Sequence, residues 1–147
     1  MATTHRNARK LTAGEHRFYL SLLCALLLNG CQSTHPWYHP LDVSLKDNQP
    51  SFAVPINSVR SGDSLQNRGM LVSRQEQQQW HIVWTSPEVT PLPDLKPGQC
   101  VTYPQVNWAE GEYSVLLGVS MNNDTERRKY MKEFNLRINP KGEIQLQ

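Results

Sequence analysis

The sequence predicts an all-β domain that follows a short apolar segment near the N-terminus. Beyond residue 40, apolar and polar residues alternate with the two-residue period of half-buried strands. Clusters of Asn, Asp, Gly and Pro, which favour turns, separate these alternating runs. Because no convincing helical period follows the apolar segment, we expect strands joined by turns and loops.

The apolar segment, residues 18–28, has the features of a secretory signal. It is too short to span about 30 Å of hydrocarbon, which takes about 20 apolar residues. Four basic residues precede it: Arg6, Arg9, Lys10 and Arg17. A basic region, a short apolar region and a small residue before the cleavage point are typical of signal peptides. We therefore predict that residues 1–30 are removed.

The segment ends in Leu28-Asn29-Gly30-Cys31, which resembles the bacterial lipobox. The cysteine of that motif is diacylated and becomes the new N-terminus. We therefore predict cleavage between Gly30 and Cys31 and lipidation of Cys31, with an ordinary secretory signal and a chance cysteine as the alternative. Because Gln32 rather than aspartate follows, the resemblance implies an anchor on the periplasmic face of the outer membrane.

Removal of residues 1–30 leaves a length suited to one domain. Residues 31–40 contain Pro36 and Pro40 and are expected to form a tether, which places the β-domain at residues 41–147. The formal net charge of +2 depends on the basic signal residues, and the remaining chain is slightly acidic. We therefore expect no nucleic-acid binding, which needs a basic surface.

The first strands of the domain are expected at residues 41–45 and 52–56, joined by a turn at 47–50. Residues 57–68 carry Ser, Asn, Asp and Gly without an apolar rhythm. We expect them to form an exposed loop.

A second hairpin is predicted from residues 69–74 and 79–85, with a polar tip at 75–78. Alternation places three apolar residues of its second strand on one face: Trp80, Ile82 and Trp84. Residues 86–97 contain four prolines, which exclude a central strand and favour a crossing between sheets.

A short strand at residues 98–103 and a corner at 104–111 lead to the clearest strand, residues 113–121. Both faces of this strand are largely apolar, so we expect it at the centre of a sheet. Residues 122–129 are expected to form a charged loop, and 130–138 another alternating strand.

The chain ends with a type I turn at residues 139–142 and an edge strand at 144–146. Eight short strands favour an antiparallel β-sandwich of immunoglobulin or fibronectin type III character, with a small open barrel as the alternative. Tyr113 resembles a tyrosine corner, whose hydroxyl bonds to upstream backbone. Either Trp80 or Trp84 is expected to lie in the core.

No catalytic signature stands out, and we expect neither enzyme activity nor a cofactor. His35 and His39 have a spacing that binds metal on a helix, but Pro36 and Pro40 break any helix there, so we expect a polar tether and no metal. His81 is expected to be a surface or hydrogen-bonded histidine of a strand.

Three other sets of residues allow both a structural and a functional interpretation. Glu110 and Glu112 are a carboxylate pair of the kind that hydrolyses sugars, but we expect both to be solvated. Glu126–Lys129 is expected at a solvated loop tip, with contact to an acidic partner as the alternative. Cys100 is expected to be a buried small hydrophobe without an internal disulfide, and a disulfide-linked dimer or a reactive thiol are the alternatives.

Six short motifs run through most of the mature chain: Trp37–Pro40, Asp47–Pro55, Gly69–Ser73, Trp80–Trp84, Pro97–Val101 and Gly111–Val115. Their order resembles the small periplasmic lipoproteins of Gram-negative bacteria identified as type VI secretion immunity proteins. In that family a cysteine often stands at the position of Ser51 and pairs with the one at Cys100. Here that cysteine is replaced by Ser51.

The resemblance implies a non-enzymatic protein, anchored to the membrane by the lipid on Cys31, that binds a cognate effector toxin and blocks its active site. A structural or accessory envelope lipoprotein, such as an assembly factor, is the alternative. Because loops carry recognition on rigid sandwiches, partner contacts are expected at residues 57–68, 86–97 and 122–129.

Overall fold

Ten strands and one short 3-10 helix make up residues 37–147, the part of the chain that the structure, a computed structural model, describes. The bounds are β1 His39–Pro40, β2 Asp42–Lys46, β3 Gln49–Ala53, η2 Ile56–Ser58, β4 Leu65–Glu76, β5 Gln79–Thr85, β6 Asp94–Leu95, β7 Val101–Thr102, β8 Gly111–Met121, β9 Glu126–Ile138 and β10 Ile144–Leu146. The all-β prediction is confirmed at this level.

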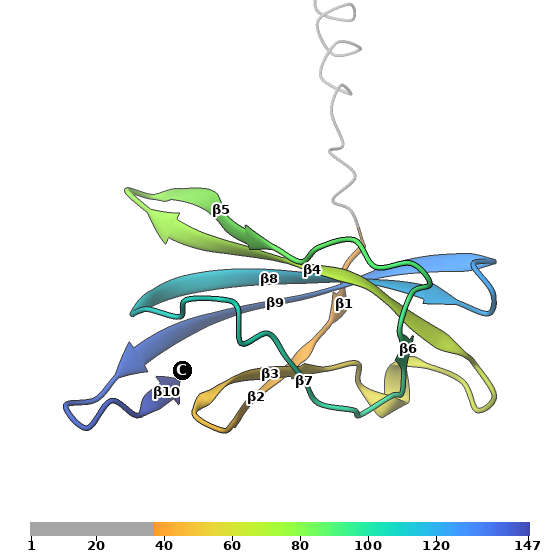
Figure 1. Cartoon of the computed structure of the whole chain (residues 1–147), viewed down its shortest axis with the longest axis horizontal. Coiled ribbons are helices and arrows are strands. Elements are labelled where there is room, and N and C mark those ends of the chain that lie inside the picture. Colours follow the sequence, from red (N-terminus) through yellow and green to blue (C-terminus); the bar gives the residue numbers. More distant parts are fainter. Residues whose placement is uncertain (1–36) are drawn as a thin grey trace, which may run out of the picture. The chain divides into compact units, whose positions relative to one another are not determined.

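The strands form two sheets (Figure 1). The larger sheet has the order β1-β9-β8-β4-β5, with β10 also paired to β9 and β6 also paired to β4. The smaller sheet has the order β2-β3-β7. The β1–β9 pair is parallel and the other pairs are antiparallel, so the larger sheet is mixed rather than antiparallel throughout.

The core lies between the two sheets. Phe52 of the smaller sheet packs against Phe134 of β9 and against Trp108, with ring centroids 6.2 and 6.1 Å apart. Tyr113 of β8 stacks on Phe134 at 5.7 Å. Burial of one large apolar side chain of this kind stabilises a fold by about 1.5–3 kcal/mol. We call the side of the larger sheet that meets these residues its core face, and the other side its outer face.

Several local predictions are confirmed. β5 has the predicted bounds, and the chain crosses from the larger sheet to β7 in the smaller one after residues 86–95, which include β6 paired to β4. At the last turn the amide of Gly142 donates to the carbonyl of Asn139 at 2.9 Å. The Tyr113 hydroxyl donates to the carbonyl of Ala109 at 2.9 Å and accepts from its amide at 3.1 Å, which is the hydrogen bonding expected of a tyrosine corner.

Two turns are tighter than predicted. Asp47 and Asn48 have φ values of 52° and 56°, and Gln77 and Gln78 have φ values of 49° and 65°. Two-residue turns with both residues in the left-handed region match the twist of hairpin strands, and Asn and Asp tolerate this region well. As a result Pro50 belongs to β3 rather than to a turn.

Two predicted loops are shorter than expected because pairing with β8 extends both neighbouring strands. Leu65 of β4 pairs with Met121, and Glu126 of β9 pairs with the same residue from the other side. Residues 65–68 and 126–129 are therefore strand, which corrects the predicted loops at 57–68 and 122–129.

A bulge in β5 overturns the predicted single apolar face of that strand. Val72 of β4 pairs with Trp84, and the next residue of β4 pairs with Ile82, which leaves Val83 as an extra residue. Trp84 therefore turns to the core face, while Ile82 and Trp80 stay on the outer face. An extra residue reverses the alternation beyond it.

Candidate functional site

The predicted cleavage and lipidation residues, Gly30 and Cys31, and the histidine His35 lie outside the described residues. His39 belongs to β1, within the predicted tether, and its ring centroid lies 5.2 Å from that of Tyr130. Among residues 37–147, no group of three or more His, Cys, Asp or Glu side chains is arranged to hold a metal ion. The described chain also contains no helix long and apolar enough to cross a membrane.

The most distinctive surface feature is the free edge of β5, at the upper side of Figure 1. β5 pairs with β4, and within the described chain no strand pairs with its other side. The residues Trp80, Ile82 and Val83 are 44%, 65% and 46% exposed. Between Gln79 and Thr85 there is no Lys or Pro, the residues that commonly protect sheet edges from pairing. We call this strand with its unpaired side the β5 edge.

An apolar cleft of about 240 Å³ opens where β5 ends, and we call it the Trp84 cleft. Its walls include Trp84, Leu92 and Tyr103, and the Trp84 and Tyr103 rings lie 5.3 Å apart. Asn67 donates from Nδ2 to the Tyr103 hydroxyl at 3.0 Å, while burial raises the pKa of that hydroxyl, so it stays neutral. The cleft is suited to an apolar side chain.

The wall of the Trp84 cleft depends on a close approach between β4 and the end of β5. A Cβ added at Gly69 would lie 2.5 Å from Oγ of Ser86. That same oxygen accepts a hydrogen bond from the amide of Met70 at 2.8 Å. Gly69 also has a φ of 112°, which L side chains rarely adopt, so only glycine fits here without strain.

A second hollow, of about 270 Å³, lies beside Trp80, and we call it the Trp80 hollow. Glu112 and Glu133 contribute exposed carboxylates to its rim. Neither carboxylate belongs to an ion pair within residues 37–147. Carboxylates next to an indole ring attract a cationic group, through charge and through the face of the ring. The sequence did not indicate this grouping, because Trp80 and Glu133 lie on strands far apart in the chain.

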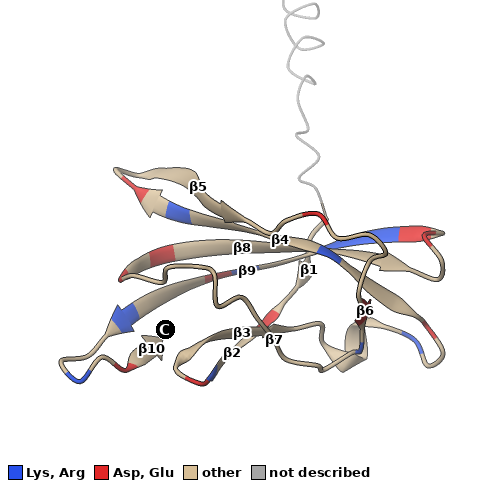
Figure 2. Cartoon of the chain, in the orientation of Figure 1, with Lys and Arg blue, Asp and Glu red and all other residues tan. Residues whose placement is uncertain are grey.

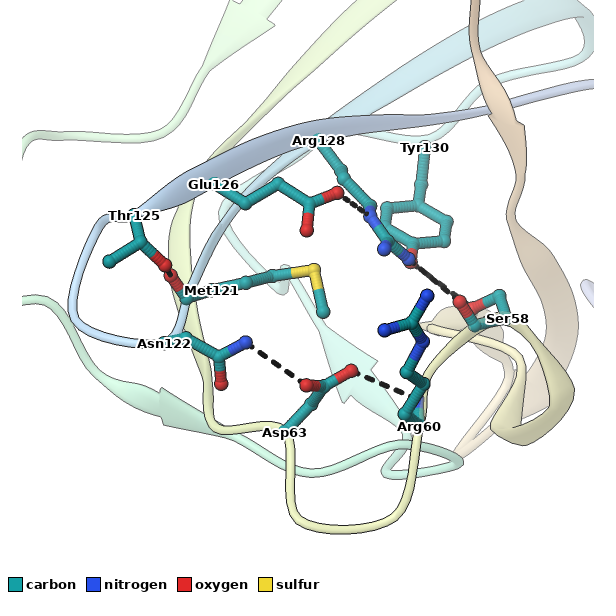
Figure 3. Close-up of polar contacts among 9 residues, drawn as sticks. All are labelled: Ser58, Arg60, Asp63, Met121, Asn122, Thr125, Glu126, Arg128 and Tyr130. Atoms are coloured by element: carbon teal, nitrogen blue, oxygen red, sulfur yellow. Dashed lines mark hydrogen bonds and ion pairs between the residues drawn. The ribbon is translucent and has the colours of Figure 1, made fainter.

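The basic run Glu126–Lys129 lies in β9, and Glu126 and Arg128 of this run make internal contacts (Figure 3). Arg128 donates from Nε to Glu126 and from Nη1 to the carbonyl of Ser58 at 2.7 Å. Arg127 donates from Nη2 to Asp124 at 2.6 Å. These partners lower the pKa of both carboxyl groups, Glu126 and Asp124. The prediction of a loop tip is wrong, because the run belongs to β9, and Arg127 and Arg128 are bonded to groups of the same chain.

The same region carries further polar contacts that fasten the segment after η2 to the β8–β9 turn (Figure 3). Asp63 accepts from Nδ2 of Asn122 at 3.0 Å and from the amide of Arg60 at 2.9 Å. These two bonds lower the pKa of Asp63, the Asn122 bond more strongly. Ser58 Oγ and the Tyr130 hydroxyl are hydrogen-bonded at 3.1 Å.

The other candidate residues are separated from these surfaces. Cys100 is free and exposed, which corrects its predicted burial. The reason is that β7 begins only at Val101, so Cys100 lies before the strand and outside the sheet packing. Glu110 accepts from the amide of Ile138 at 2.9 Å, and Ser51 is buried in β3. His81 is exposed in β5, as expected of a surface histidine.

Sequence reasoning placed partner contacts on loops and missed the β5 edge. Of the predicted loops, residues 86–97 do contribute to the Trp84 cleft. The available signal was the absence of charged residues throughout Gln79–Thr85. Comparisons of the chain with protein-family models, with curated proteins and with solved structures found no match.

Proposed function

We propose that this chain is a non-enzymatic binding protein, a lipid-anchored periplasmic immunity protein that neutralises a cognate type VI secretion effector. The observation that carries the proposal is the β5 edge, which combines an unpaired strand with exposed Trp80, Ile82 and Val83. Exposed large apolar residues gathered on one unpaired strand are typical of protein-binding sites. Binding that covers the active site of a toxin needs no catalytic residue in the immunity protein.

The sequence supports the cellular setting of this proposal. The lipobox-like ending at Gly30 and Cys31 would place a lipid at the N-terminus of the mature chain, and Gln32 favours the outer membrane. The order of the six short motifs supports the immunity family. We also propose an immunoglobulin or fibronectin type III relationship for the domain, supported by the hydrogen bonds between Tyr113 and Ala109.

The test is protection from the product of the neighbouring gene. That product is expressed in the periplasm with and without this protein, and growth is followed. We expect growth to stop without this protein and to resume with it. Toxicity that this protein leaves unchanged would contradict the proposal. In the same assay the variant Cys31→Ser tests whether protection depends on the lipid anchor, and we expect weaker protection from the unanchored protein.

The β5 edge also fits the alternative, a structural or accessory envelope lipoprotein that acts through protein binding. An assembly factor can use an unpaired strand to hold a strand of its client. A harmless neighbouring gene product, together with a position of the gene among envelope assembly genes, would favour this alternative. Loss of this protein would then weaken the envelope in cells that meet no toxin.

A further inference from the structure

We propose that the β5 edge accepts an extended segment of the partner protein as an additional strand, and that this segment has an apolar centre and basic flanks. The inference rests on the proposed protein-binding function and specifies how the partner is held. Three features support it: the unpaired backbone of β5, the charges around it, and the Trp84 cleft at its end.

The backbone of β5 is prepared for strand addition. The hairpin formed with β4 leaves the far side of residues 79–85 without a strand partner among the described residues. Alternate amide and carbonyl groups of an edge strand point away from the sheet, and an added strand can satisfy them. The exposed side chains of Trp80, Ile82 and Val83 would pack against side chains of that strand.

The charges around β5 favour a basic partner segment (Figure 2). Next to β5, strand β4 carries Arg74, opposite His81, and Arg68, in the wall of the Trp84 cleft. Residues 75–95 contain no Lys or Arg and three acidic side chains, Glu76, Glu88 and Asp94. All three are exposed. Two more carboxylates line the Trp80 hollow next to an indole ring, where a Lys or Arg side chain of the partner would bind. A second copy of this chain would bring the same acidic surface to the edge, so we assign the edge to a different protein.

The Trp84 cleft gives the proposed contact its side-chain specificity. Trp84 belongs both to the end of β5 and to the cleft wall, so a strand beside β5 runs past the opening. The cleft is mostly apolar, and a volume of about 240 Å³ accommodates one large apolar side chain. In strand addition the backbone supplies affinity and such pockets select side chains. We therefore expect Phe, Leu, Ile or Met at one central position of the segment.

The test uses an array of nonapeptides and the full chain. Each peptide has a central residue that varies through the amino acids, alternating Thr and Ile around it, and either two Lys or two Glu residues at both ends. We expect the strongest binding from Lys-flanked peptides with a large apolar central residue. Replacement of the Lys flanks by Glu should weaken binding by at least about tenfold, because the carboxylates of Glu76, Glu112 and Glu133 lie near the Trp80 end of the edge.

Two controls separate strand addition from other kinds of contact. N-methylation of the alternate peptide bonds that face β5 removes the backbone donors of the contact and keeps the side chains, so it should abolish binding, whereas N-methylation of the other alternating set should weaken binding less. Ile82→Lys adds a charge to the edge and should weaken binding by about tenfold or more. The matched control is Ile56→Lys. Ile56 is 71% exposed and lies in η2, outside β5, so this variant should bind the peptides like the unchanged protein.

Each other outcome contradicts the inference. Equal binding of N-methylated peptides, equal effects of the two lysine variants, or binding by none of the peptides would overturn strand addition. A dimer in sedimentation that Ile82→Lys dissociates would assign the edge to a second copy. Growth protection that persists in Ile82→Lys would reject the inference and leave the proposed function intact, whereas absence of protection by the unchanged protein would reject the function itself.

Discussion

The two long edges of the larger sheet differ, because the β9 edge is largely covered by other strands and the β5 edge is open. Along β9, the side away from β8 is covered by β1 at Tyr130 and Met131 and by β10 at Leu136–Ile138. The uncovered start of β9 carries Arg127, Arg128 and Lys129, and charged residues block edge pairing. Along β5, neither a covering strand nor a Lys or Arg is present in the described chain.

This difference indicates a function for β5. An open apolar edge strand promotes aggregation, and this chain avoids that risk at β9 by strand pairing and by charge. The absence of the same protection at β5 therefore calls for an explanation. The exposed Trp80 and Ile82 on the open edge carry the same risk. A partner that covers β5 accounts for both the missing charges and the exposed aromatic side chain. The predictions below test this contrast, from the largest expected effect to the smallest.

The largest effect compares a buried residue of β9 with an exposed residue of β5. Leu136 is 0% exposed, and Leu136→Ala should lower the free energy of unfolding by about 2–5 kcal/mol, because it leaves a cavity. Ile82→Ala should change it by less than about 0.5 kcal/mol, because Ile82 already meets solvent. Urea unfolding of both variants measures how much each substitution lowers the free energy of unfolding. Similar losses would show that β5 is part of the stable core and is not a binding edge.

The second effect tests the corner that leads into β8. Tyr113→Phe removes the hydroxyl that bonds to both the amide and the carbonyl of Ala109, and should cost about 1–2 kcal/mol because these part-buried groups lose their partner. Tyr38→Phe, at a side chain that is 38% exposed, is the control and should be nearly neutral. Thermal unfolding of the two variants compares them. Equal melting temperatures would mean that the corner adds no stability.

The third effect tests how β10 is held over β9. Asn48 accepts from the amide of Ile144 at 2.8 Å and donates to the carbonyl of Gly142 at 2.9 Å. Asn48→Ala loses both bonds and also strains a backbone with a φ of 56°, so it should cost about 1–2 kcal/mol. Asn48→Gly loses the bonds without the strain and should cost less. If both variants unfold like the unchanged protein in urea, this link does not hold β10.

The smallest effect concerns pH at the charged end of β9. Hydrogen bonds from Arg127, and secondarily from Ser120, lower the pKa of Asp124 below its ordinary value of 3.8. The folded form therefore favours the ionised carboxylate, and its contribution is complete above pH 3.8 and is lost as the pH falls towards the lowered pKa. Asp124→Asn should melt below the unchanged protein at pH 6, with a gap that narrows below pH 3.8. A gap independent of pH would contradict this origin.

Local features of the chain could be predicted where they depend on one strand or one turn. The bounds of β5 follow from alternation between two polar segments, and the turn at Asn139–Gly142 follows from its Pro and Gly. The hydroxyl contact of Tyr113 follows from its position near the start of a central strand. These features need no knowledge of the partner strand.

Features that depend on pairing could not be predicted. The bulge at Val83 appears only when β5 is aligned with β4, and it is what separates Trp84 from Trp80. The extension of β9 back to Glu126 depends on its partner Met121, although the local sequence is as polar as a loop. The parallel pairing of His39 with Tyr130 joins residues far apart in the chain, and short polar segments carry no signal for it.

The candidate site was less predictable than the fold. The sequence marked Cys31 for lipidation, but recognition was assigned to loops, and the β5 edge emerges only when the sheet order shows which strand lacks a neighbour. The Trp80 hollow likewise combines side chains from β5, β8 and β9. Sites of this kind depend on topology, which a pattern within one strand does not contain.

The most direct measurement is amide hydrogen exchange of the full chain, alone and with the product of the neighbouring gene. In the free protein we expect fast exchange at those amides of residues 79–85 that point to the unpaired side of β5. In the complex their exchange should slow strongly, while exchange at Arg127–Lys129 in β9 should change little. Protection confined to β9, or a complex in which residues 79–85 exchange as in the free protein, would contradict the assignment of β5 as the binding edge.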